Sequence, residues 1–352
     1  MRVLVTGGCG FIGSAVCRHY VGVGAHVVNI DKMTYAATEG STAGLPDTHY
    51  THLRADIGDP AAMAAAFDGF KPDVVIHLAA ESHVDRSISG PDAFITTNIV
   101  GTFQLLNAAR HYWERLAAEA AERFRFLHVS TDEVYGALGV GGAFTETTRY
   151  APTSPYSASK AGSDHLALAW RHTYGLPVII SNCSNNYGPF QFPEKLIPLT
   201  IINARLGRPL PVYGAGTNVR DWLHVDDHVD ALDTVLTHGA PGQSYNIGSR
   251  NERTNIELVR TLCALMDEIA PSMSPHSNLI RFVEDRPGHD HRYAIDPTKL
   301  ERELGWRSRR SFKDGLRETL NWYLDNETWW GPIRQRDGDV RLGLLPEPIA
   351  QG

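Results

Sequence analysis

Short apolar runs alternate with amphipathic segments through the first half of the chain. The runs that are long enough for one strand each are RVLVT, HVVNI, YTHLRA, DVVIHLA, RFLHVS and PVIIS. Helical patterns cover residues 11–22, 59–68, 91–111 and 155–174. Continuous apolar strands separated by helices are typical of a parallel sheet that is covered on both faces. With right-handed crossovers, the pattern predicts a doubly wound α/β fold.

After about residue 183 the chain becomes richer in Pro and Gly, and the predicted elements become shorter and mixed. Two such stretches are NNYGPFQFPEKLIP and GRPLPVYGAG. We therefore expect residues 1–183 to form the main domain and residues 184–352 a smaller mixed α/β lobe that closes over the strand ends. Residues 222–248 are candidates to return to the main domain. The last residues, LGLLPEPIAQG, are typical of a poorly packed tail.

Composition and charge exclude several kinds of partner. The 352 residues carry a formal net charge of −7 and no long basic run, so we expect no nucleic-acid partner. The four cysteines show no metal-ligand spacing, and no apolar stretch approaches the roughly 18 residues that a membrane helix needs. The first residues already fit a strand and a glycine turn, which leaves no room for a signal peptide. We expect a soluble cytoplasmic protein without a metal site, in which His77 and His128 are hydrogen-bonded core residues.

The stretch VTGGCGFIG places Gly7, Gly10 and Gly13 at three-residue spacing between the first strand and the first helix. Glycine allows a tight turn there and lets a pyrophosphate approach the amide groups at the helix N-terminus. Asp31 ends the second strand, 18 residues after Gly13, close to the roughly 20 expected for a carboxylate that binds the adenosine ribose. An Asp at this position can also cap a turn. The whole pattern predicts a Rossmann dinucleotide site that holds NAD rather than NADP.

The stretch SPYSASK places Tyr156 and Lys160 four residues apart, on one face of a helix that begins after Ser154. Free tyrosine has a pKa of about 10, too high to accept a proton at neutral pH. A nearby ammonium and a positively charged nicotinamide both favour the phenolate. The pair is therefore a candidate for removing a hydroxyl proton while a hydride leaves the same carbon.

These motifs resemble those of the extended short-chain dehydrogenase/reductases. The shared features are TGxxGxxG at residues 6–13, YxxxK at residues 156–160, and Asn98 in the preceding helical segment. The resemblance implies NAD(P)-dependent chemistry on a nucleotide-sugar, with Thr131 acting beside the tyrosine and the lysine.

The stretch STDEVYG places two carboxylates, Asp132 and Glu133, directly after an apolar strand. A solvated turn is the ordinary interpretation of such a pair. Beside a sugar oxidised at C4, however, a base at C5 and an acid at the C6 hydroxyl would together expel water. Two adjacent carboxylates resist ionising together, which favours one protonated and one ionised group. Because neighbours on a strand point to opposite faces, both can reach one substrate only if the chain turns at about Thr131.

Stretches covering nearly the whole chain closely resemble the dTDP-glucose 4,6-dehydratase family. They include HLAAESHVDRSI, VSTDEVYG, SNNYGPFQFPEKLIPL, NVRDWLHVDDH and DRPGHDHRYAID. The resemblance implies a homodimeric NAD-dependent lyase that acts on dTDP-glucose, with residues 91–111 and 155–174 at the interface. It implies Asp132 as general acid, Glu133 as general base and Tyr156 as the base of the oxidation. Thr131 and Lys160 are implied to support this tyrosine.

The same resemblance assigns the binding residues. For NAD they are Gly7, Gly10, Phe11, Ile12, Gly13, Asp31, Lys32, Thr34, Asp56, Ile57, Leu78, Ala79, Ala80, Thr97, Tyr156, Lys160 and Asn186. For the nucleotide-sugar they are Ser82, Thr131, Asn185, Lys195, Leu196, Pro211, Val212, Tyr213, Arg220, Asn255, Arg286 and His289. The chain departs from the family in YAATEGS at residues 35–41 and in a short loop near residues 137–143, which weakens any inference about the preferred sugar or nucleotide.

Two other functions stay open from the residues alone. One is a related enzyme on the same scaffold: a nucleotide-sugar 4-epimerase, or a 4,6-dehydratase that acts on a UDP-, CDP- or GDP-sugar. The Asp132–Glu133 pair argues against the epimerase, but nothing in the residues excludes another nucleotide. The other is a non-catalytic NAD-binding sensor or scaffold. Such a protein would be free to lose its acid and base residues, whereas this chain keeps all of them.

Overall fold

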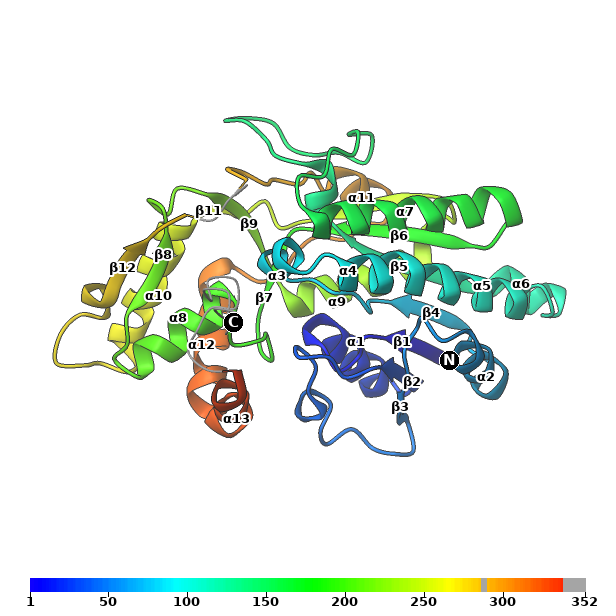
Figure 1. Cartoon of the computed structure of the whole chain (residues 1–352), viewed down its shortest axis with the longest axis horizontal. Coiled ribbons are helices and arrows are strands. Elements are labelled where there is room, and N and C mark those ends of the chain that lie inside the picture. The colour runs from blue at the N-terminus through cyan, green and yellow to red at the C-terminus, as the bar shows by residue number, and fades with distance from the viewer. Residues whose placement is uncertain (286–289, 338–352) are drawn as a thin grey trace, which may run out of the picture.

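The structure is a computed structural model that describes residues 1–285 and 290–337. It has two lobes: a larger one built around a parallel sheet, and a smaller one that faces the carboxyl ends of the strands (Figure 1). Arg286, His289 and the predicted C-terminal tail lie outside the described residues.

Among the described residues, seven strands form one sheet in which every neighbouring pair is parallel. Their order is β10-β6-β5-β4-β1-β2-β3, so the strand order changes direction between β1 and β4. This confirms the predicted doubly wound α/β fold. The strands are β1 (Arg2–Thr6), β2 (His26–Asp31), β3 (Tyr50–Arg54), β4 (Val74–His77), β5 (Arg125–Thr131), β6 (Val178–Cys183) and β10 (Ser244–Ile247).

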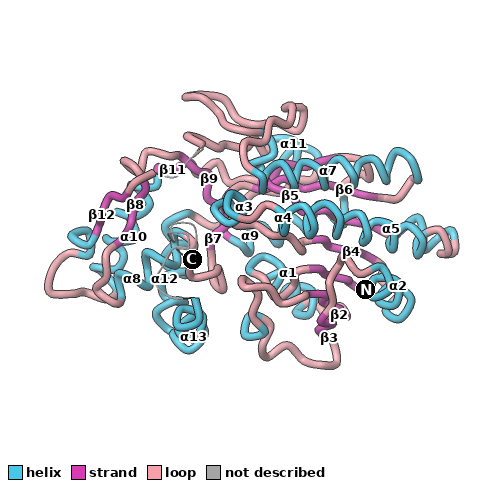
Figure 2. Tube along the Cα trace, viewed as in Figure 1, coloured by secondary structure: helices cyan, strands magenta, loops and turns pink. Residues whose placement is uncertain are grey.

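Helices cover both faces of this sheet (Figure 2). Val3 and Val5 pack in one core with side chains of α1 and α9, whereas Leu4 packs in another with side chains of α2, α5 and α7. Burial on both faces explains why the strands are continuous apolar runs. The helices and single turns of this lobe are α1 (Phe11–Gly22), η1 (Glu39–Ser41), α2 (Pro60–Phe70), α3 (Val84–Ser89), α4 (Asp92–Phe94), η2 (Ile95–Gly101), α5 (Thr102–Trp113), α6 (Ala118–Arg123), η3 (Asp132–Tyr135), α7 (Pro155–Tyr174), α9 (Val225–His238) and α11 (Thr298–Glu303).

The helix predicted over residues 91–111 is not regular. It consists of α4, the π-helical segment η2 and α5 in succession. Such wide turns within helices are frequent at functional sites. This one carries Asn98, whose side chain leaves the helix and hydrogen-bonds to the loop after β4.

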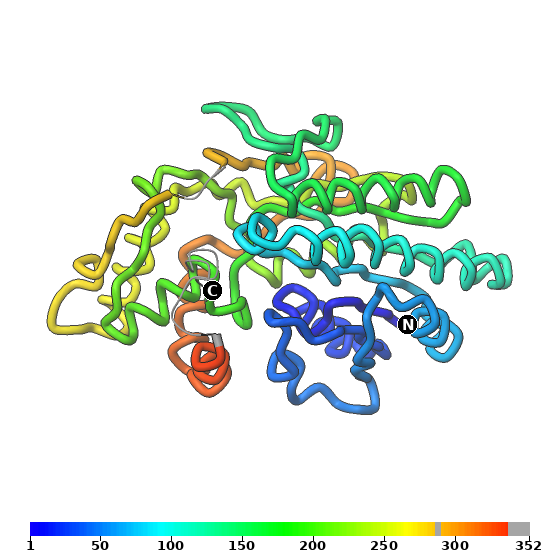
Figure 3. Tube along the Cα trace, in the orientation of Figure 1, coloured from blue at the N-terminus to red at the C-terminus, as the bar shows by residue number. Residues whose placement is uncertain are grey.

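Two segments from the second half of the chain lie in the larger lobe. Residues 225–247 supply α9 and β10, and β10 pairs with β6. Further on, α11 joins the same lobe, where Leu300 and Trp306 are buried in the core beside α1 and α9. Figure 3 shows this later, orange segment beside the green strands and helices of the larger lobe. The sequence had not indicated the second return.

The smaller lobe has its own core, which includes Ile201, Leu262 and Leu320. A three-stranded sheet and a parallel pair of strands support it. Its elements are β7 (Asn185–Tyr187), α8 (Leu196–Arg205), β8 (Leu210–Tyr213), β9 (Val219–His224), β11 (Glu252–Thr254), α10 (Asn255–Ile269), η4 (His276–Leu279), β12 (Ile280–Val283), α12 (Phe312–Asp325) and α13 (Glu327–Asp337). Within the described part of the chain, no helix is long and apolar enough to cross a membrane.

Candidate active site

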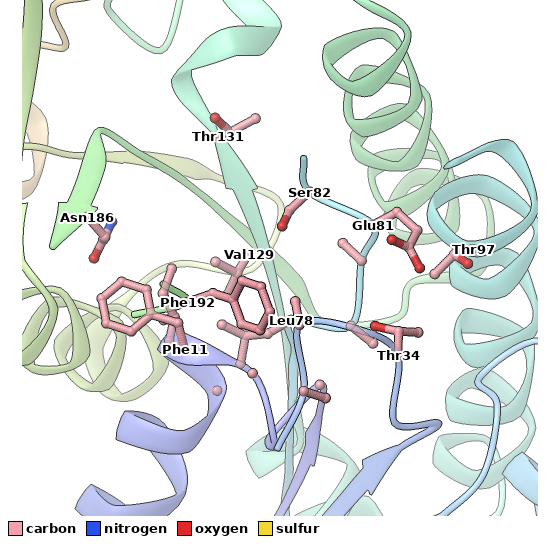
Figure 4. A pocket seen from close by; sticks show the side chains of 18 of the residues that line it. Phe11, Thr34, Leu78, Glu81, Ser82, Thr97, Val129, Thr131, Asn186 and Phe192 are labelled. Carbon is pink, nitrogen blue, oxygen red and sulfur yellow. The ribbon is translucent and has the colours of Figure 1, made fainter. Parts of the chain in front are cut away.

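The candidate site lies at the carboxyl ends of β1, β4, β5 and β6, the edge at which open α/β sheets bind ligands. A cavity of about 330 Å³ there is lined by residues of both lobes (Figure 4). A second cavity of about 180 Å³ adjoins it, and the two share Ser82, Glu133 and Lys195 among their lining residues. Every residue assigned to NAD by resemblance lines the first cavity except Asp56.

In the glycine loop between β1 and α1, backbone segments lie so close together that two positions leave no room for a side chain. Gly7 has a φ of +75°, and a Cβ there would lie 2.7 Å from the backbone nitrogen of Ala79. A Cβ on Gly13 would lie 2.1 Å from the carbonyl oxygen of Gly7. The first turn of α1 therefore packs directly on the loop, with its free amide groups at the cavity. This arrangement fits the pyrophosphate of a dinucleotide.

Asp31 is fixed at the end of β2 by backbone donors. Its Oδ2 accepts a hydrogen bond from the Cys9 amide at 3.0 Å, and its Oδ1 accepts one from the Met33 amide at 2.8 Å. The carboxylate is almost fully buried and lines the cavity, as a ribose-binding residue must. Next to it, Lys32 donates to Thr97 at 2.8 Å. Asp56 lies outside the lining, with its Oδ2 3.5 Å from the Lys32 Nζ.

Asn98 holds one wall of the cavity. Its Oδ1 accepts from the Glu81 amide at 2.8 Å, while its Nδ2 donates to the Glu81 carbonyl at 3.0 Å and to Ser159 at 2.8 Å. Glu81 and Phe192, which line the first cavity, were missed by the sequence reasoning. Figure 4 shows Glu81 with Thr97 toward one side of the cavity and Phe192 with Asn186 toward the other.

Tyr156 and Lys160 lie in the first turns of α7. The helix begins after Ser154, as predicted, with Pro155 in its first position. Ser154 and Ser157 also form a capping box there, which the sequence reasoning had not identified. Lys160 is buried, and its Nζ donates to the carbonyl of Val129 at 2.8 Å. Burial lowers the pKa of Lys160 and raises the pKa of Tyr156 well above its ordinary value. A hydrogen bond to Thr131 opposes the shift of the tyrosine pKa.

The chain turns directly after Thr131, where β5 ends and η3 begins. The Thr131 hydroxyl accepts from the Glu133 amide at 3.3 Å and caps η3. Glu133 lines both cavities. Asp132 lines neither, and its Oδ2 is buried with no hydrogen-bond partner within the described ranges. Burial, followed by the negative charge of Glu133, raises the pKa of Asp132 well above its usual 3.8.

The described residues assigned to the nucleotide-sugar line the second cavity, except Thr131, which lines the first. Arg220 is almost fully buried there; its guanidinium lies 4.4 Å from the ring centre of Tyr293 and donates to the Asp290 carbonyl at 2.9 Å. Glu194, not singled out from the sequence, lines both cavities, and its carboxylate lies 3.4 Å from the His83 ring. The assigned residues that line this cavity are Ser82, Asn185, Lys195, Leu196, Pro211, Val212, Tyr213, Arg220 and Asn255.

Comparison with known proteins identifies the family. Residues 4–319 match the family model described as GDP-mannose 4,6 dehydratase. A probable dTDP-glucose 4,6-dehydratase of Sinorhizobium fredii is 58% identical and covers 98% of this chain and 99% of its own length. The dTDP-glucose 4,6-dehydratase of Neisseria meningitidis is 57% identical, covering 98% of each chain. The chain belongs to the dTDP-glucose 4,6-dehydratase family.

Solved structures agree with membership of the dTDP-glucose 4,6-dehydratase family. A dTDP-glucose 4,6-dehydratase from Streptomyces venezuelae, solved with NAD bound, matches with a TM-score of 0.86 and 45% identity over 95% of this chain and all of its own. A UDP-glucose 4-epimerase from Thermus thermophilus, also solved with NAD, matches with a TM-score of 0.82 but only 28% identity, over 93% of this chain and all of its own. The scaffold is thus shared with epimerases, whereas the sequence is closer to the dehydratases.

Proposed function

We propose that the protein converts dTDP-glucose to dTDP-4-keto-6-deoxyglucose and water, with NAD as its cofactor. The observation that carries this proposal is the Asp132–Glu133 pair, because Glu133 lines the first cavity together with Tyr156 and Lys160 and also lines the second. Relatives named as dTDP-glucose 4,6-dehydratases at 57–58% identity favour this reaction over the epimerase and over other nucleotide-sugars.

The first cavity would hold the cofactor. Its glycine loop takes the pyrophosphate, and Asp31 accepts hydrogen bonds from the ribose hydroxyls while repelling a 2′-phosphate. When bound, NAD supplies the oxidation at C4 of the sugar and, later in the same turnover, the reduction at C6. The second cavity would take the nucleoside diphosphate, with the cationic side chains of Lys195 and Arg220 toward the phosphates and Pro211 and Tyr213 toward the base.

Tyr156 would take the proton of the C4 hydroxyl during the oxidation. Burial opposes its ionisation, so the phenolate needs stabilisation from its surroundings. The hydrogen bond to Thr131 stabilises it, and Lys160 places a positive charge four residues further along the same helix face.

Glu133 would then remove the proton from C5, which the new ketone at C4 has made acidic. Asp132 would donate a proton to the C6 hydroxyl, which leaves as water. Burial and the neighbouring negative charge raise the pKa of Asp132 and so favour its acid form, whereas Glu133 lies at the cavities. The side chain of Asp132 must turn toward the substrate for this transfer, which would break the 3.4 Å hydrogen bond that its Oδ1 accepts from the Thr131 hydroxyl.

The Glu133→Gln variant tests this assignment. We expect it to retain NAD and substrate binding but to lose elimination by at least about 100-fold, because a positioned general base typically contributes 10²–10⁴-fold. Glu114→Gln, which changes an exposed helical ion pair with Arg110, is the matched control and should keep full activity. If the Glu133→Gln variant loses water from the substrate at the wild-type rate, Glu133 is not the base of the elimination.

We also propose a cytoplasmic homodimer. We place the interface on residues 91–111 and 155–174. Three apolar side chains support it, because Ile95, Val100 and Tyr174 are 41–46% exposed there, and Ile88 on the neighbouring α3 is 49% exposed. All four cysteines are buried and unpaired, which suits a reducing compartment. Light scattering of wild type and Val100→Asp tests the dimer, which the charged variant should weaken. A monomeric wild type at micromolar concentration would contradict it.

A further inference from the structure

A buried carboxylate lies behind the catalytic tyrosine and lysine and takes no part in the steps above. Asp164 follows Lys160 by four residues on α7, just as Lys160 follows Tyr156, so the three share one helix face. Asp164 is fully buried. Figure 1 shows α7 running along β5 and β6, and hydrogen bonds from Lys160 to the Val129 carbonyl and from the Ser130 hydroxyl to Asp164 place this face against β5.

The carboxylate of Asp164 is held by three side chains. Its Oδ2 accepts hydrogen bonds from the Ser130 hydroxyl at 2.7 Å and the Tyr150 hydroxyl at 2.9 Å. Its Oδ1 lies 3.0 Å from the Nε2 of His128. These three contacts fix the carboxylate against β5 and the segment before α7.

We propose that Asp164 is a positioning residue, the buried counter-charge that keeps Lys160 protonated and fixes the catalytic end of β5 against α7. Lys160 is buried and donates to one backbone carbonyl, that of Val129. An ammonium in such surroundings loses its proton easily unless a negative charge is near. Burial does lower the pKa of Lys160, and Asp164 is the largest influence that raises it again.

The contacts of Asp164 also reach the reacting residues through the backbone. Ser130, which it holds, directly precedes Thr131, and Val129 supplies the carbonyl that holds Lys160. One side chain thereby links α7, which carries Tyr156, to the strand end that carries the two carboxylates.

The other titratable groups around Lys160 do not replace this charge. His128 on β5 and His77 on β4 are hydrogen-bonded core residues, as predicted, and burial lowers the pKa of both, so they are neutral. Burial raises the pKa of Cys183 on β6 to about 12, so it is a neutral thiol. Tyr150 and Tyr135 face Asp164 from the segments before α7, and burial raises the pKa of each phenol.

The Asp164→Asn variant tests the proposal, because the substitution removes the charge of the side chain and keeps its shape. The proposal itself rests on the proposed dehydratase reaction. Without the counter-charge, Lys160 gives up its proton at lower pH. In the plot of kcat against pH, we therefore expect the fall in kcat on the alkaline side (the alkaline limb) to begin about one pH unit lower than in the wild type. The KM for dTDP-glucose should stay within about twofold, because Asp164 lines neither cavity. Tyr150→Phe is the matched control: it removes one hydrogen bond to the same carboxylate but no charge, and its alkaline limb should stay in place.

If the folded Asp164→Asn variant loses kcat at the same alkaline pH as the wild type, the counter-charge role is overturned. If that variant does not fold, Asp164→Glu, which keeps the charge, should retain the wild-type limb, and a limb displaced by one unit would overturn the proposal as well. Nitrogen NMR titration of the Lys160 side chain in the NAD-bound protein gives a second readout that does not depend on turnover. Failure of the wild type to form the keto-deoxy product would instead reject the proposed function.

Discussion

Gly13 is the position at which one methyl group should damage the cofactor site most cleanly. In Gly13→Ala the new Cβ would lie 2.1 Å from the Gly7 carbonyl oxygen and 2.8 Å from the Gly7 carbon and the Gly8 Cα. All three atoms are backbone atoms of the glycine loop, so no side chain can turn away. Gly22→Ala is the matched control, because Gly22 lies in the same helix and nothing lies within 4 Å of its added Cβ.

The size of the effect follows from these distances. Cβ atoms essentially never approach other heavy atoms within 3.0 Å, so the loop must shift by the difference between 3.0 and 2.1 Å, about 0.9 Å. Overpacking of this kind costs about 1–3 kcal/mol, against a helix-propensity gain of up to about 1 kcal/mol from Gly to Ala. At about 2.1 cal/mol/K per residue, a net 2 kcal/mol lowers the Tm of a 352-residue chain by about 3 °C.

The larger consequence is for NAD. A displacement of about 1 Å moves the amide groups of the loop out of position for the pyrophosphate, and such misplacement costs at least about tenfold. We expect calorimetry on the NAD-free protein to show at least this loss for Gly13→Ala and a change below about twofold for Gly22→Ala. Equal NAD affinity in wild type and Gly13→Ala would refute the placement of the pyrophosphate on this loop.

Three further changes probe other parts of the site. Asp31→Ser should reduce the preference for NAD over NADP at least about tenfold in binding assays, and an unchanged ratio would contradict the ribose role. Asn98→Ala removes three hydrogen bonds and should lower the free energy of unfolding, measured by urea denaturation, by about 2–4 kcal/mol. A loss below about 0.5 kcal/mol would show that the cavity wall around Glu81 does not depend on Asn98. Because the folded pKa of Asp132 is raised, its contribution to stability is lost as pH rises from the usual 3.8 toward that pKa. The gain in stability of Asp132→Asn over wild type should therefore grow with pH above about 4, and a pH-independent difference would contradict the buried acid.

The larger lobe could be predicted from the sequence because its elements follow from local pattern. Residues 2–6 and 178–183 are apolar on both faces, and the structure buries both faces of these strands under helices. The interruption of residues 91–111 by the π-helical segment η2 was not predicted from the sequence. Asn98 on this segment hydrogen-bonds to the backbone of Glu81, and these two parts of the chain meet only in the folded protein.

Part of the candidate site could be predicted from the sequence, because the carboxyl ends of parallel strands all lie on the same side of the sheet. That rule brings the glycine loop, Asp31 and Thr131 to one cavity, which Tyr156 lines from the start of α7. Burial is a property of the packed chain, so adjacency alone could not show that Glu133 lines the cavities while its neighbour Asp132 does not. For the same reason the return of α11 to the larger lobe carried no local signal.

The central claim is tested most directly by mass spectrometry of the product formed from dTDP-glucose in heavy water. Oxidation at C4, elimination across C5–C6 and reprotonation at C5 predict a nucleotide-sugar that has lost one water and gained one deuteron, located at C5. A product of unchanged mass with inverted configuration at C4 would contradict the account and would make the protein an epimerase.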